Sequence, residues 1–349
     1  MPENRDWKNF FANYLPTLIV MWAGIALSAG DFRVRTFNGY FLIHNDSGTI
    51  WFPLTADRLL TAAGIVYTVA LIAYYRLFPA TVSKARIALS WLMRWARRQQ
   101  PRFGFAEKQA WLAIALKFFF LPLMINFVVN NLAIVAREYH ALTTVAAGFH
   151  LHLYLLLLNL LFFVDVIIFT FGYMVEIPRL DNVIRSVEPT FLGWAVCIAC
   201  YPPFNGMATY VFPWQSSDAP RFTDSALEIG ADCLILGLMA IYAWASVALG
   251  WKASNLTNRG VIASGPYRWV RHPAYAAKNL AWWIGALPTF AAAFSGSLEK
   301  GLWSVGCMAL FTVIYAARAW TEERHLSLLG DGYDRYKQQI HYRFIPGVC

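Results

Sequence analysis

Eight long apolar stretches limit what this chain can fold into. They run approximately over 14–30, 58–78, 111–136, 151–175, 189–212, 229–250, 276–294 and 301–320. A helix needs about 20 mainly apolar residues to cross the hydrocarbon core of a bilayer, and these stretches are close to that length. The pattern therefore predicts an all-α fold, a polytopic membrane bundle of about eight transmembrane helices.

The composition argues against a water-soluble protein. Hydrophobic residues make up 58% of the 349 residues and charged residues only 14%, whereas soluble domains carry about 45–50% and about 25%. The net charge of +9 is not gathered into a lysine-rich tail or a nucleic-acid-binding motif. We therefore expect membrane lipids, and no nucleic acid, among the partners.

The distribution of Lys and Arg predicts the orientation in the membrane. With the N-terminus in the cytoplasm, the five inside segments carry 19 Lys and Arg residues, and the four outside segments carry five. Cytoplasmic connections of membrane proteins hold the excess of positive charge. We expect an integral membrane protein with both the N- and C-termini in the cytoplasm.

The chain is expected to have two regions. Residues 1–188 form an N-terminal transmembrane region, which includes a basic cytoplasmic segment over 79–110 where Ile87, Trp91 and Trp95 recur at helical spacing among cations. This pattern is typical of a helix that lies on an anionic membrane surface. Its cations either contact lipid headgroups or, as the favoured interpretation, only anchor the topology. Residues 189–349 are expected to form the C-terminal functional domain.

Polar residues inside the apolar stretches are candidates for function, because ionisable groups are expensive at membrane depth. Asp165 in the fourth stretch either joins helices or lines a substrate cavity. No metal site is expected, since His140, His150 and His152 have no carboxylate at a recognised ligand spacing.

The fifth stretch contains two consecutive prolines in its middle, within Tyr201-Pro-Pro-Phe204-Asn205. Proline removes a backbone donor and kinks a helix, and broken helices are tolerated in membranes where protein or a cavity resupplies hydrogen bonds. The kink indicates either a pocket or a packing adjustment. If it is a pocket, Tyr201, Phe204 and Asn205 are the candidate substrate contacts.

Charged pairs flank the last two apolar stretches. Arg271-His272 precede the seventh stretch, and Glu322-Glu323 follow the eighth. Only residues 295–300 join the two helices, so both pairs return to the same side of the membrane. We expect two cationic or donor groups and two carboxylates to meet there, in a pocket at the cytoplasmic end of the C-terminal helices.

These motifs resemble a known family. The run Gly265-Pro-Tyr-Arg-Trp-Val-Arg-His-Pro-Ala-Tyr275, the pair Glu322-Glu323 and the tail Gly330-Asp-Gly-Tyr333-Asp-Arg-Tyr336 are similar to the isoprenylcysteine carboxyl methyltransferases and the related phospholipid methyltransferases. The resemblance covers about residues 250–349. One departure is Ala277, where the family usually has glycine.

The resemblance implies methyl transfer from S-adenosylmethionine to a lipidic or prenylated acceptor, with a carboxylate favoured, at the cytoplasmic membrane face. Two alternatives are an NADPH-dependent reductase of a sterol or polyprenoid and a non-enzymatic transporter or scaffold. The end of the chain, Tyr342–Gly347, is similar to the membrane sterol reductases. However, those enzymes lack a proline at the position of Pro273 and lack the Glu-Glu pair.

With this cofactor, each motif residue has an expected role. Arg271 and His272 suit its carboxylate through charge-assisted bonds, and Glu322 or Glu323 suits its ammonium or ribose hydroxyls. Tyr267 and Tyr275 offer rings to the adenine or the sulfonium. The expected catalytic residues are Arg271, His272 and Glu322; the expected cofactor-binding residues are Gly265, Tyr267, Arg271, His272, Pro273, Tyr275, Glu322 and Glu323.

Overall fold

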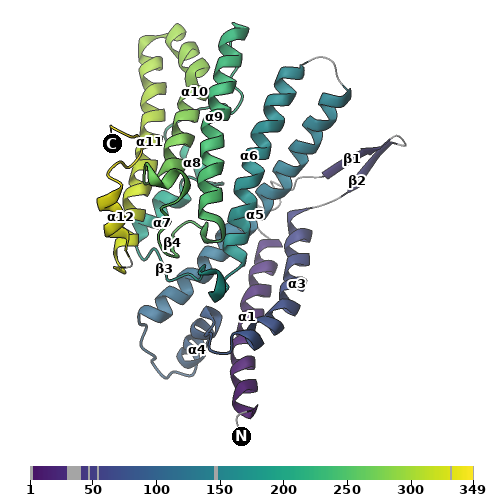
Figure 1. Ribbon diagram of the computed structural model, residues 1–349, viewed down its shortest axis with the longest axis vertical. Helices are drawn as coiled ribbons and strands as arrows, with labels where there is room; N and C mark the ends of the chain where they lie inside the picture. Colours follow the sequence, from purple (N-terminus) through teal and green to yellow (C-terminus); the bar gives the residue numbers. More distant parts are fainter. Residues whose placement is uncertain are drawn as a thin grey trace. The chain divides into compact units, whose positions relative to one another are not determined.

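The structure is 74% helical with almost no strands, in agreement with the predicted all-α fold (Figure 1). The structure is a computed structural model that describes residues 3–29, 41–45, 48–52, 55–144, 148–330 and 332–348. Most of the predicted external segment 31–57, and motif residue Asp331, lie outside the described residues. The chain divides into two compact units, Met1–Asn130 and Asn131–Cys349. The functional boundary expected after residue 188 stays a prediction.

The first unit is built around α1. It contains α1 (Glu3–Ala29), the antiparallel pair β1 (Phe41–Asn45) and β2 (Gly48–Phe52), α3 (Ala56–Leu77), α4 (Lys84–Ala96) and the first part of α5 (Phe105–Thr144). Helix α1 packs against α3 and α4. Phe10, Leu71 and Tyr75 form a buried cluster between α1 and α3, and Thr17 Oγ1 and Tyr75 Oη lie 2.8 Å apart in a hydrogen bond.

Helix α4 lies in the basic segment 79–110. Ser83 caps its start, because its hydroxyl accepts a hydrogen bond from the backbone N–H of Arg86 at 3.0 Å. Trp95 is 61% exposed, and Arg94 lies in the last turn of the helix. This mixture of exposed apolar and basic side chains fits the expected interfacial helix, whose lipid contact stays a prediction.

Four helices of the second unit lie side by side in the order α6, α9, α10 and α11 (Figure 1). Tyr154, Met239 and Ala281 fill the space between the first three, and Phe311 and Tyr315 are buried on α11. The elements of this unit are the end of α5, α6 (Phe149–Met174), η1 (Pro178–Leu180), β3 (Ser186–Val187), α7 (Phe191–Ile198), α8 (Phe204–Ala208), α9 (Ser225–Leu249), η2 (Gly250–Lys252), β4 (Thr257–Asn258), η3 (Gly265–Arg268), α10 (Pro273–Gly296), α11 (Leu298–Ser327) and α12 (Tyr333–Gln339).

Six described helices are long and apolar enough to cross a membrane. They span Trp7–Ala29, Ala56–Leu77, Phe105–Thr144, Phe149–Met174, Ser225–Lys252 and Leu298–Ser327. They correspond to six of the eight predicted stretches and indicate an integral membrane protein. The predicted count of eight is not reproduced among the described residues.

The other two stretches differ for identifiable reasons. The stretch 189–212 is not one helix: α7 ends at Ile198, and α8 begins only at Phe204, after two prolines that cannot donate backbone hydrogen bonds. The stretch 276–294 lies in α10, a continuous helix that packs between α9 and α11. It is not among the six, and the polar residues Lys278 and Asn279 near its start lower its mean hydropathy.

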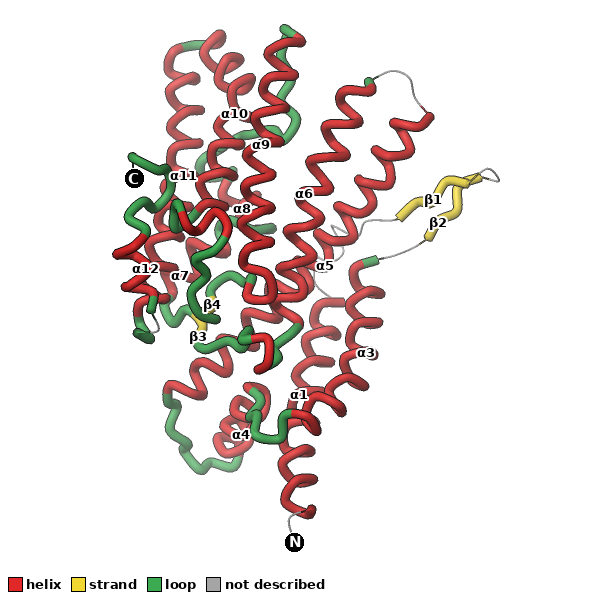
Figure 2. The backbone as a smooth tube through the Cα atoms, viewed as in Figure 1, coloured by secondary structure: helices red, strands yellow, loops and turns green. Residues whose placement is uncertain are grey.

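The end of α6 is bound tightly to the loop that follows α9. The buried Arg259 guanidinium donates to the carbonyl oxygens of Gly172 and Asn182. The Gly172 carbonyl lies in the last turn of α6, where the helix itself offers no backbone N–H to bond it. Ser186 pairs with Asn258 in the β3–β4 ladder, whose strands lie among loops (Figure 2). These contacts bring the segments before α7 and after α9 together.

Glycine is required at the position on α6 that contacts the loop after α9. A Cβ atom added to Gly172 would lie 1.8 Å from the carbonyl oxygen of Ala253, whereas one added to Gly237 on α9 would meet nothing within 4 Å. Gly172→Ala should lower stability by about 1–3 kcal/mol or more, because the loop must move. Gly237→Ala, the matched control, should raise stability by up to about 1 kcal/mol.

The melting temperatures of both variants in detergent measure this difference. A Gly172→Ala protein that melts at or above the wild-type temperature would contradict the packing of α6 against the Ala253 loop.

Candidate functional site

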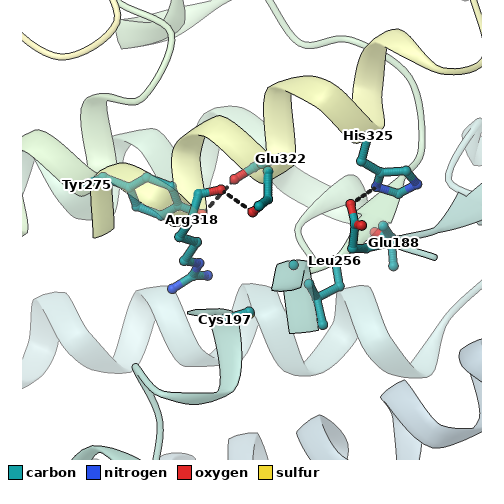
Figure 3. A pocket seen from close by; sticks show the side chains of 10 residues that line it. Glu188, Cys197, Leu256, Tyr275, Arg318, Glu322 and His325 are labelled. Atoms are coloured by element: carbon teal, nitrogen blue, oxygen red, sulfur yellow. Dashed lines mark hydrogen bonds and ion pairs between the residues drawn. The ribbon is translucent and has the colours of Figure 1, made fainter. Parts of the chain in front are cut away.

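A narrow pocket lies where α11 meets the start of α10 and the segments before α7 and at β4 (Figure 3). Its charged and polar lining comes from elements far apart in the sequence, which the β3–β4 pairing brings together. The side chains that carry the following argument are Glu188, Cys197, Tyr275, Arg318, Glu322 and His325.

Arg318 is the buried cation of this pocket. Its side chain is 6% exposed, and its guanidinium carbon lies 4.8 Å from the ring centre of Tyr275 and 5.4 Å from that of Tyr201. One of its nitrogens donates to the side-chain oxygen of Asn255. Within the described residues, no carboxylate lies at ion-pair distance from it. Cys200 and Tyr201 also form side-chain hydrogen bonds with it. A buried guanidinium held by uncharged groups of this kind retains most of its attraction for an anion.

Asn255 holds Arg318 in place. The Asn255 side-chain amide donates to the hydroxyls of Tyr173 at 2.7 Å and Tyr201 at 3.0 Å, and its backbone N–H also donates to Tyr173 at 2.8 Å. Because both amide hydrogens are used in this way, the amide oxygen is directed to Arg318. The network joins α6, the β4 segment and α11.

Glu322 supplies a carboxylate on the same pocket wall. The hydroxyl of Tyr275 donates to it at 2.7 Å (Figure 3). Glu322 is partly exposed, unlike the buried Glu323 beside it. The pocket therefore combines a cation, a carboxylate and an aromatic face.

A second carboxylate, Glu188, lies at the far side of the pocket and is 2% exposed. Its oxygens lie 3.9 Å from Nδ1 of His325 and 3.6 Å from the Arg324 guanidinium. Nε2 of His325 lies 2.9 Å from the Ser186 hydroxyl. Glu188 thus fixes the end of α11 to the segment between β3 and α7.

Glu323 faces a different set of partners. It accepts hydrogen bonds from Arg271 at 2.8 Å and from Arg343 at 2.9 Å, and its carboxylate lies 3.1 Å from Nε2 of His272. The expected meeting of the Arg-His and Glu-Glu pairs is therefore made through Glu323. Arg271 and Glu323 line a second, more open hollow of about 460 Å³, which Arg324 also borders.

The Glu323 cluster also fastens the end of the chain. Arg271 donates from its side chain to the carbonyl oxygens of Ile340 and His341, and the backbone N–H groups of Arg271 and His272 donate to residues 342 and 343. Together these bonds attach the last described segment to the start of α10.

Three further motif residues shape the loop before α10 and are not in the described lining of either hollow. Gly265 has φ +58°, and a Cβ there would lie 2.8 Å from that of Ala248, so the turn favours glycine. The carbonyl of Tyr267 accepts from the Tyr336 hydroxyl at 2.6 Å. Burial raises the pKa of Tyr336, which keeps this donor protonated. Pro273 occupies the first turn of α10.

The expected substrate contacts separate in the structure. Tyr201 belongs to the Arg318 network through Asn255. Phe204, 42% exposed, and Asn205 lie on α8, and the Asn205 side-chain oxygen accepts from the backbone N–H of Gly206 at 2.8 Å. Tyr201 therefore adjoins the pocket through its contacts with Asn255 and Arg318.

Sequence reasoning assigned no role to Arg318, Asn255 or Glu188. An arginine 20 residues into a membrane-spanning helix was a usable signal, because charges at that depth are rare and functional. Asn255 and Glu188 lie in loop segments whose pairing through β3 and β4 involves two residues in each strand. Such short pairings leave no readable pattern.

Residues 229–327 match the model of the isoprenylcysteine carboxyl methyltransferase family. The matched stretch contains most of α9 and all of α10 and α11, with the pocket residues Tyr275, Arg318 and Glu322. Glu188 lies outside the matched stretch. No curated protein and no solved structure matches the chain.

The six apolar helices indicate an integral membrane protein, and its residues 229–327 are similar to a family of membrane methyltransferases. This confirms the resemblance found in the motifs, with Arg271, His272 and Glu322-Glu323 inside the matched residues.

Glu323→Gln should loosen the C-terminal segment. The substitution leaves Arg271 and His272 buried without their carboxylate, and breaking a buried pair costs about 3–5 kcal/mol. Hydrogen–deuterium exchange of residues 340–348 in detergent should become faster. Asp334→Asn, on the exposed face of α12, is the control and should leave this exchange unchanged. Equal protection in Glu323→Gln and the wild type would rule out the fastening role.

Proposed function

We propose that this protein transfers the methyl group of S-adenosylmethionine to a lipidic or prenylated acceptor at the cytoplasmic membrane face, with a carboxylate acceptor favoured. The proposal includes cytoplasmic N- and C-termini, as the distribution of Lys and Arg predicts. The observation that carries it is Arg318, a buried guanidinium with no carboxylate partner among the described residues, beside Glu322 within a methyltransferase-family domain.

The chemistry of the pocket fits the charged end of the cofactor. S-adenosylmethionine carries a carboxylate, an ammonium and a sulfonium, and the pocket presents Arg318, Glu322 and the ring of Tyr275. A guanidinium binds a carboxylate by charge-assisted hydrogen bonds, and an aromatic face attracts a cation. When bound, the cofactor supplies a methyl group on a positively charged sulfur.

The protein's own contribution is alignment and exclusion of water. The amide of Asn255 orients Arg318, and the hydroxyl of Tyr275 orients Glu322. Displacements of this kind depend on holding donor and acceptor in line in a dry site. A carboxylate acceptor is ionised at neutral pH, so the favoured reaction needs no general base.

The motif residues around Glu323 belong to the proposed site as positioning groups. Arg271 and His272 are engaged by Glu323, so we assign them to holding the C-terminal segment against the loop that begins at Gly265. This revises their expected role as direct ligands of the cofactor carboxylate and gives that role to Arg318. In this proposal Tyr201 borders the cofactor's charged end, while Phe204 and Asn205 remain candidate contacts of the acceptor.

Calorimetric titration of the detergent-solubilised protein with S-adenosylmethionine and with NADPH tests the proposal. The wild type should bind S-adenosylmethionine and not NADPH. Arg318→Met and Glu322→Gln should each weaken binding more than tenfold, about 1.4 kcal/mol, because each removes a charge that the ligand needs. The exposed residues Arg335 and Glu299 provide matched controls, and Arg335→Met and Glu299→Gln should bind as the wild type does.

Binding of NADPH in place of S-adenosylmethionine would favour the reductase alternative. Binding of neither compound would favour the non-enzymatic alternative, and either result would refute the proposal.

A further inference from the structure

A lysine one turn after Tyr275 on α10 lies among aromatic side chains. The ammonium nitrogen of Lys278 lies 5.0 Å from the ring centre of Tyr242, 5.3 Å from that of Trp282 and 5.9 Å from that of Phe162. The rings come from α6, α9 and α10, so the side chain points into the groove between these helices. Lys278 is five residues from the start of α10, or about 8 Å along the axis, at the end of the helix that carries the motif.

This ammonium has unused hydrogen-bond donors. A lysine carries three N–H donors, and among the described residues none of them meets an acceptor or a carboxylate at ion-pair distance. Asp165 and Asp218 act on Lys278 only through longer-range attraction. The oxygens of Asp165 accept instead from the hydroxyls of Tyr242, at 2.8 Å, and Ser246.

A second unused donor borders the same tryptophan. The indole nitrogen of Trp214 is buried and meets no hydrogen-bond partner in the part of the chain that the structure describes. The Trp214 ring lies 5.8 Å from that of Trp282 and is stacked on Phe311 at 3.8 Å. A buried donor without an acceptor is destabilising, and a lysine charge at membrane depth is expensive and usually functional.

The two donors adjoin the candidate pocket through a continuous aromatic wall. The ring centre of Trp282 lies 5.2 Å from that of Tyr315, which lies 5.7 Å from that of Tyr275. Tyr275 in turn holds Glu322. A ligand group at Lys278 would therefore lie next to the pocket and on the side of α10 that faces α6 and α9.

We propose that Lys278 and Trp214 form an oxyanion-binding site at Trp282, which holds the carboxylate or phosphate of the acceptor's head group. This rests on the proposed function, because the acceptor head must lie beside the pocket that binds the methyl donor. Both groups border Trp282 and can donate to an anionic head group, and charge-assisted hydrogen bonds are strong in an apolar setting. The site makes Lys278 a specificity-determining residue that selects anionic acceptors from neutral lipids of equal length.

Binding of three ten-carbon probes tests this site without requiring catalysis. Decanoate, decyl phosphate and 1-decanol are titrated calorimetrically into the full-length protein in a neutral detergent. The wild type should bind at least one anionic probe more than tenfold tighter than 1-decanol. The probe with the larger preference identifies the head group as carboxylate or phosphate.

Variants locate the preference. Lys278→Met should abolish it and leave 1-decanol binding unchanged, whereas Lys278→Arg should retain most of it. Trp214→Phe, which removes only the N–H donor, should reduce the preference several-fold, and it decides the matter if Lys278→Met does not fold. Lys300→Met, at the exposed hairpin of α10 and α11, is the control and should behave as the wild type.

An unchanged preference in Lys278→Met and Trp214→Phe would overturn the site, as would a wild type without any preference. Binding of S-adenosylmethionine is measured on the same samples. A wild type that binds no S-adenosylmethionine but prefers anionic probes contradicts the proposed function and not the oxyanion site, so the two failures are distinguishable.

Discussion

A buried arginine whose charge is not neutralised by the described protein is the constraint on which the site depends. Placing a guanidinium in an apolar interior is costly unless polar groups surround it. The Asn255 amide and three tyrosine rings stabilise the Arg318 guanidinium. None of these groups carries a negative charge. These groups hold the side chain in place, and they leave its positive charge able to attract an anion.

The rest of the second unit maintains this arrangement. Asn255 reaches Arg318 only because the loop after α9 is held by Arg259 and by the close contact at Gly172. The same loop pairs with β3, which brings Glu188 to the end of α11. On the other side of α11, Glu323 pairs with Arg271, His272 and Arg343. Adjacent glutamates thus serve different purposes, one facing the pocket and one fastening the chain.

Much of the fold was predictable from the sequence, because a long apolar run has few structural options in a membrane. The exceptions are the run with Pro202 and Pro203, which forms two short helices, and α10, which has Lys278 and Asn279 near its start and packs between α9 and α11. Hydropathy counts residues and does not register which neighbours cover them.

The site was predictable only in part. The short hairpin between α10 and α11 correctly indicated that Arg271 and His272 meet the Glu-Glu pair. It did not indicate which glutamate each contacts, because that depends on side-chain direction around α11. The roles of Asn255 and Glu188 depend on loop pairing, which has no period in the sequence. Arg318 was visible as a charge in an apolar helix, but its missing counter-ion is a property of the three-dimensional packing.

Methyl transfer to a lipid is tested by incubating the purified protein with methyl-labelled S-adenosylmethionine and a total lipid extract. The products are then analysed by mass. If the proposed function is right, the wild type forms a labelled lipid whose mass is increased by one methyl group. Arg318→Met forms much less of this lipid. Absence of any labelled lipid with the wild type, under conditions where the protein remains folded, would contradict the proposed function.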